Sequence, residues 1–408
     1  MITFWIDSFK HFYGLRPNAS FKFDYKNGCP SYFNELFLLY GIDFDIKKIK
    51  EDKPDPNKIN ICLIPAQGKP GPGFLHEQII GATIAAKDNI LWCYDHGIKV
   101  VIDRSREQAP WNIYDMIEYL DTNGYIDPFH FRILVNKYSL HDHVKPHKPI
   151  HSSLIIESNF FMYEMGGLCY NYIKSDKIYS LNIKPKKSEK KYKFISLFGE
   201  IRKPQRLLLA NTMLEKNMLK DSYWTTVLRY SDDNVKANFS DSIQWFKDIY
   251  GAEQYDYIVK DRRFDSGKLD NMSDRITPEQ AFESDLWVGI ESSYKWNFYT
   301  EKSFKPIALE MPYIIFGRDI HNDCFCKDFN FEKHDELFDY SLIEKGLYLD
   351  DFESLDRHTK RFCEVLDTYN NPHNNITKEK CKHNKDVFLQ KTSKDNFVKF
   401  VNEVFDSW

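Results

Sequence analysis

Three consecutive residues, Thr300-Glu301-Lys302, combine a hydroxyl, a carboxylate and an ammonium at a point where a helix is expected to begin. The pattern predicts an apolar strand before the triplet and a helix after it that leads into a second apolar strand. A lysine there can neutralise a phosphate, and a glutamate can accept hydrogen bonds from ribose hydroxyls. The helix N-terminus adds backbone donors and a partial positive charge. Together these features predict a site for an anionic ligand of the sugar-nucleotide type.

A second candidate site lies in the segment 193–221, which reads as a strand, a polar loop and a helix. Pro204 marks the helix start, because a proline at the first helical position gives up no intrahelical hydrogen bond. Arg206 follows in the first turn, and Arg202 lies just before the helix. A guanidinium can hold two phosphate oxygens at once, which a lysine cannot do. Either arginine is therefore a candidate for binding a diphosphate.

These two blocks, in this order, resemble the donor-binding domain of the α-1,3-fucosyltransferases and their exostosin-like relatives. In that family an apolar strand ends in Glu-Asn, an aromatic residue precedes Thr-Glu-Lys, and a helix leads to a Pro-Ile/Val strand. Here the first strand is 286–290, its glutamate is Glu291, and the aromatic residues are Phe298 and Tyr299. The closing strand is 312–316.

The resemblance covers roughly the second half of the chain and implies a glycosyltransferase of the GT-B type. It implies that a nucleoside-diphosphate sugar is bound by Tyr299, Thr300, Glu301, Lys302, Glu291, and Arg206 or Arg202. Ser292 stands where the family usually has asparagine, so one polar contact of the family is altered. The family further implies transfer to an acceptor hydroxyl with inversion of the anomeric centre.

The pattern is also similar to uncharacterised glycosyltransferase-like proteins of tailed phages. The acceptor is then either a glycan or a hydroxymethylated base of DNA, which would have to be flipped out of the helix. A non-catalytic protein that binds a sugar nucleotide or a glycan is the alternative to an enzyme.

Inverting transfer needs one general base that takes the proton of the acceptor hydroxyl. In open α/β sheets the active crevice lies beyond the carboxyl ends of the strands. Glu107, shortly after a predicted strand that ends at Asp103, is the first candidate, and Asp103 is the second. Glu77 and Glu157 also qualify by position, so four carboxylates compete for this role.

The loop 67–73 is rich in glycine and precedes a predicted helix, so that Gly71 and Gly73 can let the backbone approach the acceptor or a phosphate. The loop matches neither GxGxxG nor a Walker motif, and no nucleotide cofactor of those classes is predicted. The DxD at 43–45 and the histidines over 141–151 are interpreted as surface charges and an exposed loop. A diphosphate held by arginine and lysine needs no metal, so metal-independent chemistry without a cofactor is predicted.

An α/β rhythm of short apolar strands and helices predicts parallel sheets covered on both faces. The predicted elements are strands at 60–65, 97–103, 131–135, 256–259 and 286–290 and helices at 75–96 and 111–120. A lysine-rich run over 182–193 interrupts the rhythm like a linker. We therefore expect two Rossmann-like domains in the GT-B arrangement, 1–182 for the acceptor and 193–345 for the donor. Helices over 346–408 are expected to follow and to be able to pack back on the first domain.

Charge and cysteine content narrow the classes further. The 408 residues carry 56 Lys+Arg and 60 Asp+Glu, a net charge of -4, so no global basic field predicts nucleic-acid binding. Only local basic runs such as 184–193 can meet an acidic polymer. Eight cysteines without a CxxC pair predict reduced thiols. Without a signal-peptide pattern or a run of about 18 apolar residues, a cytoplasmic protein with no transmembrane segment is expected, in the host cytoplasm if a phage encodes it.

Overall fold

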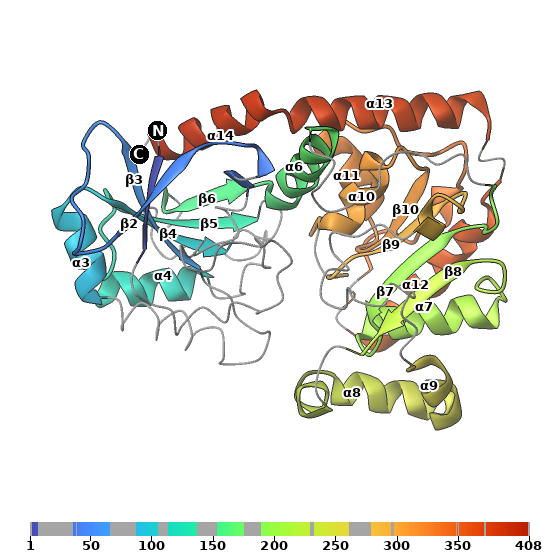
Figure 1. Ribbon diagram of the computed structural model, residues 1–408. Coiled ribbons are helices and arrows are strands. Elements are labelled where there is room, and N and C mark those ends of the chain that lie inside the picture. Colours follow the sequence, from blue (N-terminus) through green and yellow to red (C-terminus); the bar gives the residue numbers. More distant parts are fainter. Residues whose placement is uncertain are drawn as a thin grey trace. The chain divides into compact units, whose positions relative to one another are not determined.

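The computed structural model describes residues 2–6, 36–37, 39–65, 87–104, 113–136, 153–174, 189–228, 232–260, 279–294, 298–347, 349, 351–370 and 373–406. By their contacts the residues divide into two compact units (Figure 1). Unit 1 is Met1–Lys174 with Thr392–Trp408, and unit 2 is Ser175–Lys391. The domain boundaries predicted at 182, 193 and 346 stay predictions, and the part of the chain after 346 is divided between the two units after Lys391.

Unit 1 is built on a six-stranded parallel sheet with the strand order β2-β1-β3-β4-β5-β6. The strands are β1 (Ile2–Ile6), β2 (Phe44–Lys48), β3 (Ile59–Pro65), β4 (Lys99–Arg104), β5 (Phe131–Asn136) and β6 (Ile155–Ser158). The residues of β4 and β5 are almost continuously buried, as expected for parallel strands with both faces covered. The first two strands extend the sheet beyond the predicted start of the rhythm near residue 60.

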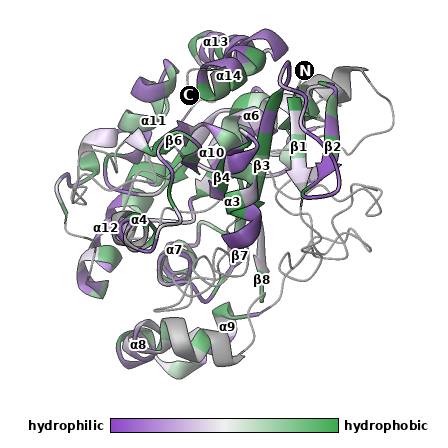
Figure 2. Ribbon diagram, turned by 90° about the vertical axis from the view of Figure 1, so that its left-hand side faces the viewer, coloured by the Kyte–Doolittle hydropathy of each residue, from purple (hydrophilic) through white to green (hydrophobic). Residues whose placement is uncertain are grey.

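The helices described in unit 1 are α3 (Lys87–Asp95), α4 (Ile113–Thr122), α6 (Phe160–Lys174) and α14 (Lys394–Asp406). Helix α14 is amphipathic, and Figure 2 shows that it carries both hydrophobic and hydrophilic residues. Phe397 of α14 stacks on Tyr40 with ring centroids 4.5 Å apart, and Phe400 stacks on Tyr163 at 5.3 Å. These contacts join the C-terminal helix to Tyr40 in the first part of the chain and to α6.

Unit 2 contains a four-stranded parallel sheet with the order β10-β9-β7-β8. The strands are β7 (Ile195–Glu200), β8 (Tyr223–Val227), β9 (Trp287–Ile290) and β10 (Tyr313–Phe316). From β7 the chain continues to β8 on one side, and the later strands β9 and β10 lie on the other side. The strand order therefore reverses between β7 and β9, which makes this pair the topological switch point of the sheet.

The α-helices described in unit 2 are α7 (Pro204–Glu215), α8 (Asp232–Tyr250), α9 (Ala252–Ile258), α10 (Glu301–Ala308), α11 (His321–Phe329), α12 (Phe352–Asp367) and α13 (Asn375–Lys391). Two short 3-10 helices, η1 (Glu279–Ala281) and η2 (Tyr340–Leu342), complete the description. Side chains of α7 and α12 share one core with Val288, Ile290 and Phe316. On the opposite face Gly289 lies against α10, where a Cβ atom would come within 3.2 Å of the Lys302 carbonyl oxygen.

The strand predicted at 256–259 is wrong, because these residues belong to α9 and to the turn after it. The Val259 amide donates to the carbonyl oxygen of Tyr255, which is a helical spacing. In this helix Ile258 is the buried residue, whereas Asp256 and Tyr257 are exposed. A run of four residues is too short for its apolar pattern to distinguish a strand from one helical turn. Among the helices that the structure describes, none is long and apolar enough to cross a membrane.

The packing of α14 can be tested at Phe397, which is fully buried between the rings of Phe37 and Tyr40. Phe397→Ala leaves a cavity between these rings and should lower the free energy of unfolding by about 3–5 kcal/mol. Urea unfolding followed by tryptophan fluorescence measures the change. Lys399→Ala, on the same helix with a side chain that is 72% exposed, is the matched control and should change little. Equal stabilities of the two variants would contradict the packing described for α14.

Candidate functional site

Two helices begin beside each other at the carboxyl edge of the unit 2 sheet. Helix α7 follows β7 and helix α10 follows β9, and these neighbouring strands are in register at Ile195 and Trp287. The two connections also touch, because Gln205 Nε2 donates to the carbonyl oxygen of Ser292 over 3.2 Å. Paired strands lie about 4.8 Å apart. The N-termini of α7 and α10 therefore flank the switch point, where open α/β sheets bind their ligands.

The start of α10 is attached to the end of β9 by Glu291, whose side chain is buried. Its Oε1 accepts from the Thr300 amide at 3.0 Å and from Ser303 Oγ at 2.5 Å. Its Oε2 accepts from Thr300 Oγ1 at 2.7 Å and from the Ser292 amide at 3.2 Å. Burial raises the pKa of Glu291, and the charge of Lys302 and the hydrogen bonds from Ser303 and Thr300 act in the opposite direction. All four hydrogen bonds to the Glu291 carboxylate therefore come from groups of the protein itself.

Lys302 presents its ammonium at the rim of this edge. Its Nζ lies 3.3 Å from Thr300 Oγ1 and forms an ion pair with Glu301. The Lys302 side chain is 21% exposed, whereas that of Glu301 is 7% exposed. Thr300 is the N-cap of α10, since its hydroxyl accepts from the Lys302 amide at 3.3 Å. The predicted triplet therefore does open a helix, and its lysine is the member that solvent or a ligand can reach most easily.

The two candidate arginines at the end of β7 have different surroundings. Arg202 forms a two-pronged pair with Glu200, with Nε 2.7 Å from Oε1 and Nη2 3.3 Å from Oε2, and both side chains are buried. Arg206 lies in the first turn of α7 and is as buried as Arg202, and its Nη1 is 3.5 Å from the Glu200 carbonyl oxygen. It packs over Gly199, where a Cβ atom would come within 2.7 Å of Nη1 and where φ is +63°. Glycine thus provides both the backbone conformation and the space for this guanidinium.

Tyr299 points into the interior of unit 2. Its side chain is buried, and its hydroxyl donates to Asp328 Oδ2 at 3.0 Å. Its ring meets His321 edge-on with centroids 5.0 Å apart. His321 is itself fully buried, its Nε2 lies 3.3 Å from Ser303 Oγ, and burial lowers its pKa to about 3. The structure therefore gives Tyr299 a packing role behind α10 and leaves His321 neutral at physiological pH.

The candidates for a general base lie in unit 1, and the structure describes two of them. Asp103 is buried at the carboxyl end of β4, in register with Leu134 of β5. Glu157 lies on β6 and is exposed. Glu107, Glu77 and the glycine-loop residues Gly71 and Gly73 lie outside the described residues. Their roles stay predictions.

The sequence motifs considered for metal binding have other partners or lie outside the description. Asp45 on the edge strand β2 forms an ion pair with Lys58 at 2.5 Å, and this contact lowers the pKa of Asp45. The histidines at 141–151 are not among the described residues. Within the part of the chain that the structure describes, no three His, Cys, Asp or Glu side chains gather as metal ligands would.

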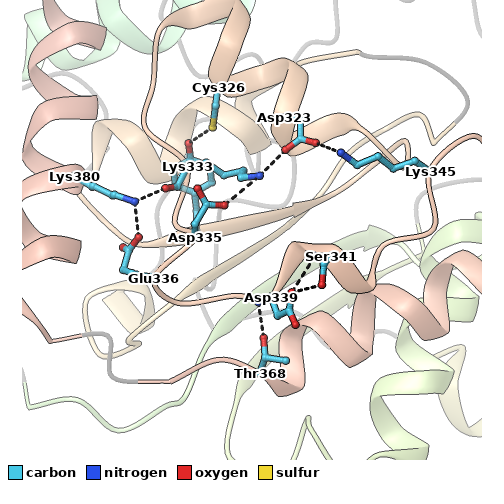
Figure 3. Close-up of polar contacts among 11 residues, drawn as sticks. Asp323, Cys326, Lys333, Asp335, Glu336, Asp339, Ser341, Lys345, Thr368 and Lys380 are labelled. Atoms are coloured by element: carbon cyan, nitrogen blue, oxygen red, sulfur yellow. Dashed lines mark hydrogen bonds and ion pairs between the residues drawn. The ribbon is translucent and has the colours of Figure 1, made fainter.

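A surface hollow of about 700 Å³ in unit 2 is lined by residues of α11, η2 and the segments around them, and none of the predicted site residues lines it. Both lysines that line it are paired with aspartates (Figure 3). Lys333 contacts Asp323 at 2.6 Å and Asp335 at 3.1 Å, and Lys345 contacts Asp323 at 2.9 Å. Asp339 caps η2 by accepting from the Ser341 amide at 3.1 Å. The hollow is therefore a network of structural ion pairs and caps.

Four residues of the edge were not predicted: Glu200, Gln205, Ser303 and His321. Glu200 ends a buried strand and precedes two arginines, so its position was a usable indication of a buried pair. Ser303 and His321 gave no such indication, because their contact depends on how α10 and α11 pack. The sequence places these helices in order but does not specify that a serine and a histidine face each other.

The similarity of this chain to known proteins is distant. No family model matches the chain, and no curated protein matches it. Among solved structures the chain is similar to one titled "Crystal Structure of alpha1,3-Fucosyltransferase", with 10% sequence identity and a TM-score of 0.32. The similarity covers 96% of this chain and 91% of that chain. A likeness this distant carries no argument about what this chain does.

The buried His321 predicts a pH dependence of stability. An unfolded histidine has a pKa of about 6.5, whereas that of His321 is about 3 in the folded state. Between these values the unfolded chain binds a proton that the folded chain does not. The stability due to the neutral ring is therefore complete above pH 6.5 and is lost as the pH falls toward 3, by about 1.4 kcal/mol per pH unit.

His321→Gln should remove this contribution and flatten the dependence of the unfolding free energy on pH between 6.5 and 5. Urea unfolding at several pH values measures the slope. The exposed His383 offers the matched control, because His383→Gln should keep the wild-type slope. A wild-type slope in His321→Gln would show that this ring titrates normally.

Proposed function

We propose that this chain is a glycosyltransferase of the GT-B type that moves a sugar from a nucleoside-diphosphate donor to an acceptor hydroxyl, with inversion and without a metal. The donor binds at the carboxyl edge of the unit 2 sheet. One observation carries the proposal: the N-termini of α7 and α10 flank the switch point and bring Arg206 and Lys302 to it. Two helix N-termini with one cation each suit a diphosphate.

The proposed reaction assigns a task to each side chain. The acceptor hydroxyl gives its proton to the general base, for which Glu107 and Asp103 are the candidates, as its oxygen forms a bond to the anomeric carbon. The bond from that carbon to the diphosphate breaks on the opposite face, which inverts the centre. Negative charge then grows on the leaving diphosphate, and Lys302 and Arg206 stabilise it there. Glu301 accepts hydrogen bonds from the ribose hydroxyls.

The acceptor is proposed to be a glycan or a hydroxymethylated DNA base. Part of the basic run that could meet DNA is engaged within unit 2, because Lys190 donates to the Ser284 carbonyl oxygen at 2.6 Å and Lys191 pairs with Glu283 at 2.6 Å. One observation favours the non-catalytic alternative, a sugar-nucleotide or glycan-binding protein. Asp103, a candidate base, is only 5% exposed, and a buried carboxylate is poorly placed to take a proton from an acceptor.

A thermal-shift panel of UDP, GDP, CDP and dTDP, with and without Mg²⁺, tests the donor site. One diphosphate should raise the melting temperature, because a ligand at about 100 times its Kd stabilises the native state by about 2.7 kcal/mol. Lys302→Ala should reduce the shift, since it removes the ammonium at the start of α10. Lys327→Ala, an exposed lysine of α11, is the matched control and should keep it.

No shift from any of the four diphosphates in the wild type would contradict the proposed donor site. A shift that is equal in wild type and Lys302→Ala would place the ligand elsewhere. A bound donor that is neither transferred nor hydrolysed over hours would favour the non-catalytic alternative.

The two arginines should respond differently to substitution by lysine. Arg202→Lys breaks the two-pronged pair with Glu200 inside the protein and should lower the free energy of unfolding by up to about 3–5 kcal/mol. Arg206→Lys leaves the pair of Arg202 with Glu200 intact and should weaken diphosphate binding, because one ammonium cannot replace two parallel hydrogen bonds. Urea unfolding and calorimetric titration separate the two effects. An Arg206→Lys variant that binds as tightly as wild type would remove Arg206 from the site.

A further inference from the structure

The hydrogen bonds around Glu291 fix the direction in which Thr300 can act. Each carboxylate oxygen of Glu291 accepts from a backbone amide, Oε1 from Thr300 and Oε2 from Ser292. The Thr300 hydroxyl therefore donates its only hydrogen to Oε2, at 2.7 Å. Its lone pairs are left to face Lys302, whose amide and Nζ both lie 3.3 Å away. The Glu291 carboxylate and the Lys302 ammonium are thus both hydrogen-bonded to the Thr300 hydroxyl.

The same carboxylate orders the other side of the helix start. Ser303 Oγ lies 2.5 Å from Glu291 Oε1 and 3.3 Å from His321 Nε2. Because the carboxylate can only accept, the serine hydrogen points to Glu291, and the serine oxygen then accepts from His321 Nε2–H. The neutral ring is held in one tautomer by this bond. Glu291, Thr300, Ser303 and His321 form a continuous chain from β9 through the first turn of α10 to α11.

We propose that Glu291 is a positioning residue of the donor site and makes no contact with the donor. Its buried carboxylate sets the orientation of Thr300 and, through Thr300, the place of the Lys302 ammonium. A side chain that is only 1% exposed, with four hydrogen bonds turned inward, has no surface left for a ligand. The proposal rests on the proposed function for its ligand, but its structural part can be tested separately.

Hydrogen exchange measured by mass spectrometry tests the structural part without any ligand. Glu291→Gln replaces one of the two accepting oxygens with an NH2 group, which itself donates. The groups that donate to that oxygen, among them either the Thr300 amide or the Ser292 amide, then lose their acceptor. Exchange in the peptide 298–304 should accelerate by at least about tenfold. The peptide 204–213 of α7 serves as the internal control and should exchange as in wild type. Unchanged exchange in the first peptide, or equal acceleration in both, would overturn the proposal.

Inorganic pyrophosphate tests the link to Lys302 in a double-mutant cycle. Glu291→Gln should weaken pyrophosphate binding by about tenfold in the wild-type background and should have no further effect in Lys302→Ala, because it acts through that lysine. Equal losses in both backgrounds would mean that Glu291 acts directly or through general unfolding, and would overturn the proposal. If wild type does not bind pyrophosphate at all, the proposed function fails, and the exchange experiment still decides whether Glu291 positions α10.

The hydroxyl between the two groups provides a rescue test. Thr300→Val keeps the shape of the side chain but removes the oxygen, so it should reproduce the loss of affinity seen in Glu291→Gln. Thr300→Ser keeps the oxygen and should bind pyrophosphate within about twofold of wild type. Loss of binding in both variants would show that packing of the threonine methyl group, rather than the hydrogen-bonded chain, is what matters.

Discussion

The carboxylate of Glu291 is the group on which the arrangement of unit 2 depends most directly. Moving a carboxylate out of water is costly, and the cost is acceptable only where several donors replace the lost hydration. Here two backbone amides and two hydroxyls do so. Because these donors come from the loop after β9 and from the first turn of α10, the same bonds that stabilise the charge also fix the direction in which the helix starts.

The switch point of the sheet explains why the two predicted motifs can serve one site. They are about one hundred residues apart in the sequence, yet β7 and β9 are neighbours. The hydrogen bond from Gln205 to Ser292 shows that the segments after the two strands also lie next to each other. A parallel sheet places the helix starts at the same edge, so α7 and α10 both begin there. Gly289 assists by allowing α10 to lie close to β9.

Much of this edge could be predicted from the sequence. The strands ending near Ile290 and Phe316 and the helix starting at Pro204 were expected from apolar runs and from proline placement, and the structure confirms these elements. The predicted strand at 256–259 failed because a single buried residue, Ile258, satisfies one turn of a helix as well as a short strand. The orientation of Tyr299 could not be predicted, since an aromatic residue beside a polar motif suits a ligand and a core equally, and packing against Phe325 and Phe329 decided it.

The pairing of charges at the edge has a consequence for binding. Arg202 already has a carboxylate partner in Glu200 and holds it in two hydrogen bonds, so a diphosphate would have to break a buried pair to reach it. The ion pair between Lys302 and Glu301 is different, because the lysine is partly exposed and its carboxylate partner is the residue directly before it. A diphosphate carries more charge than one carboxylate and meets the N-terminus of α10 at the same time, so it can compete for this ammonium. The cation that is easiest to recruit is therefore the one that Glu291 and Thr300 orient.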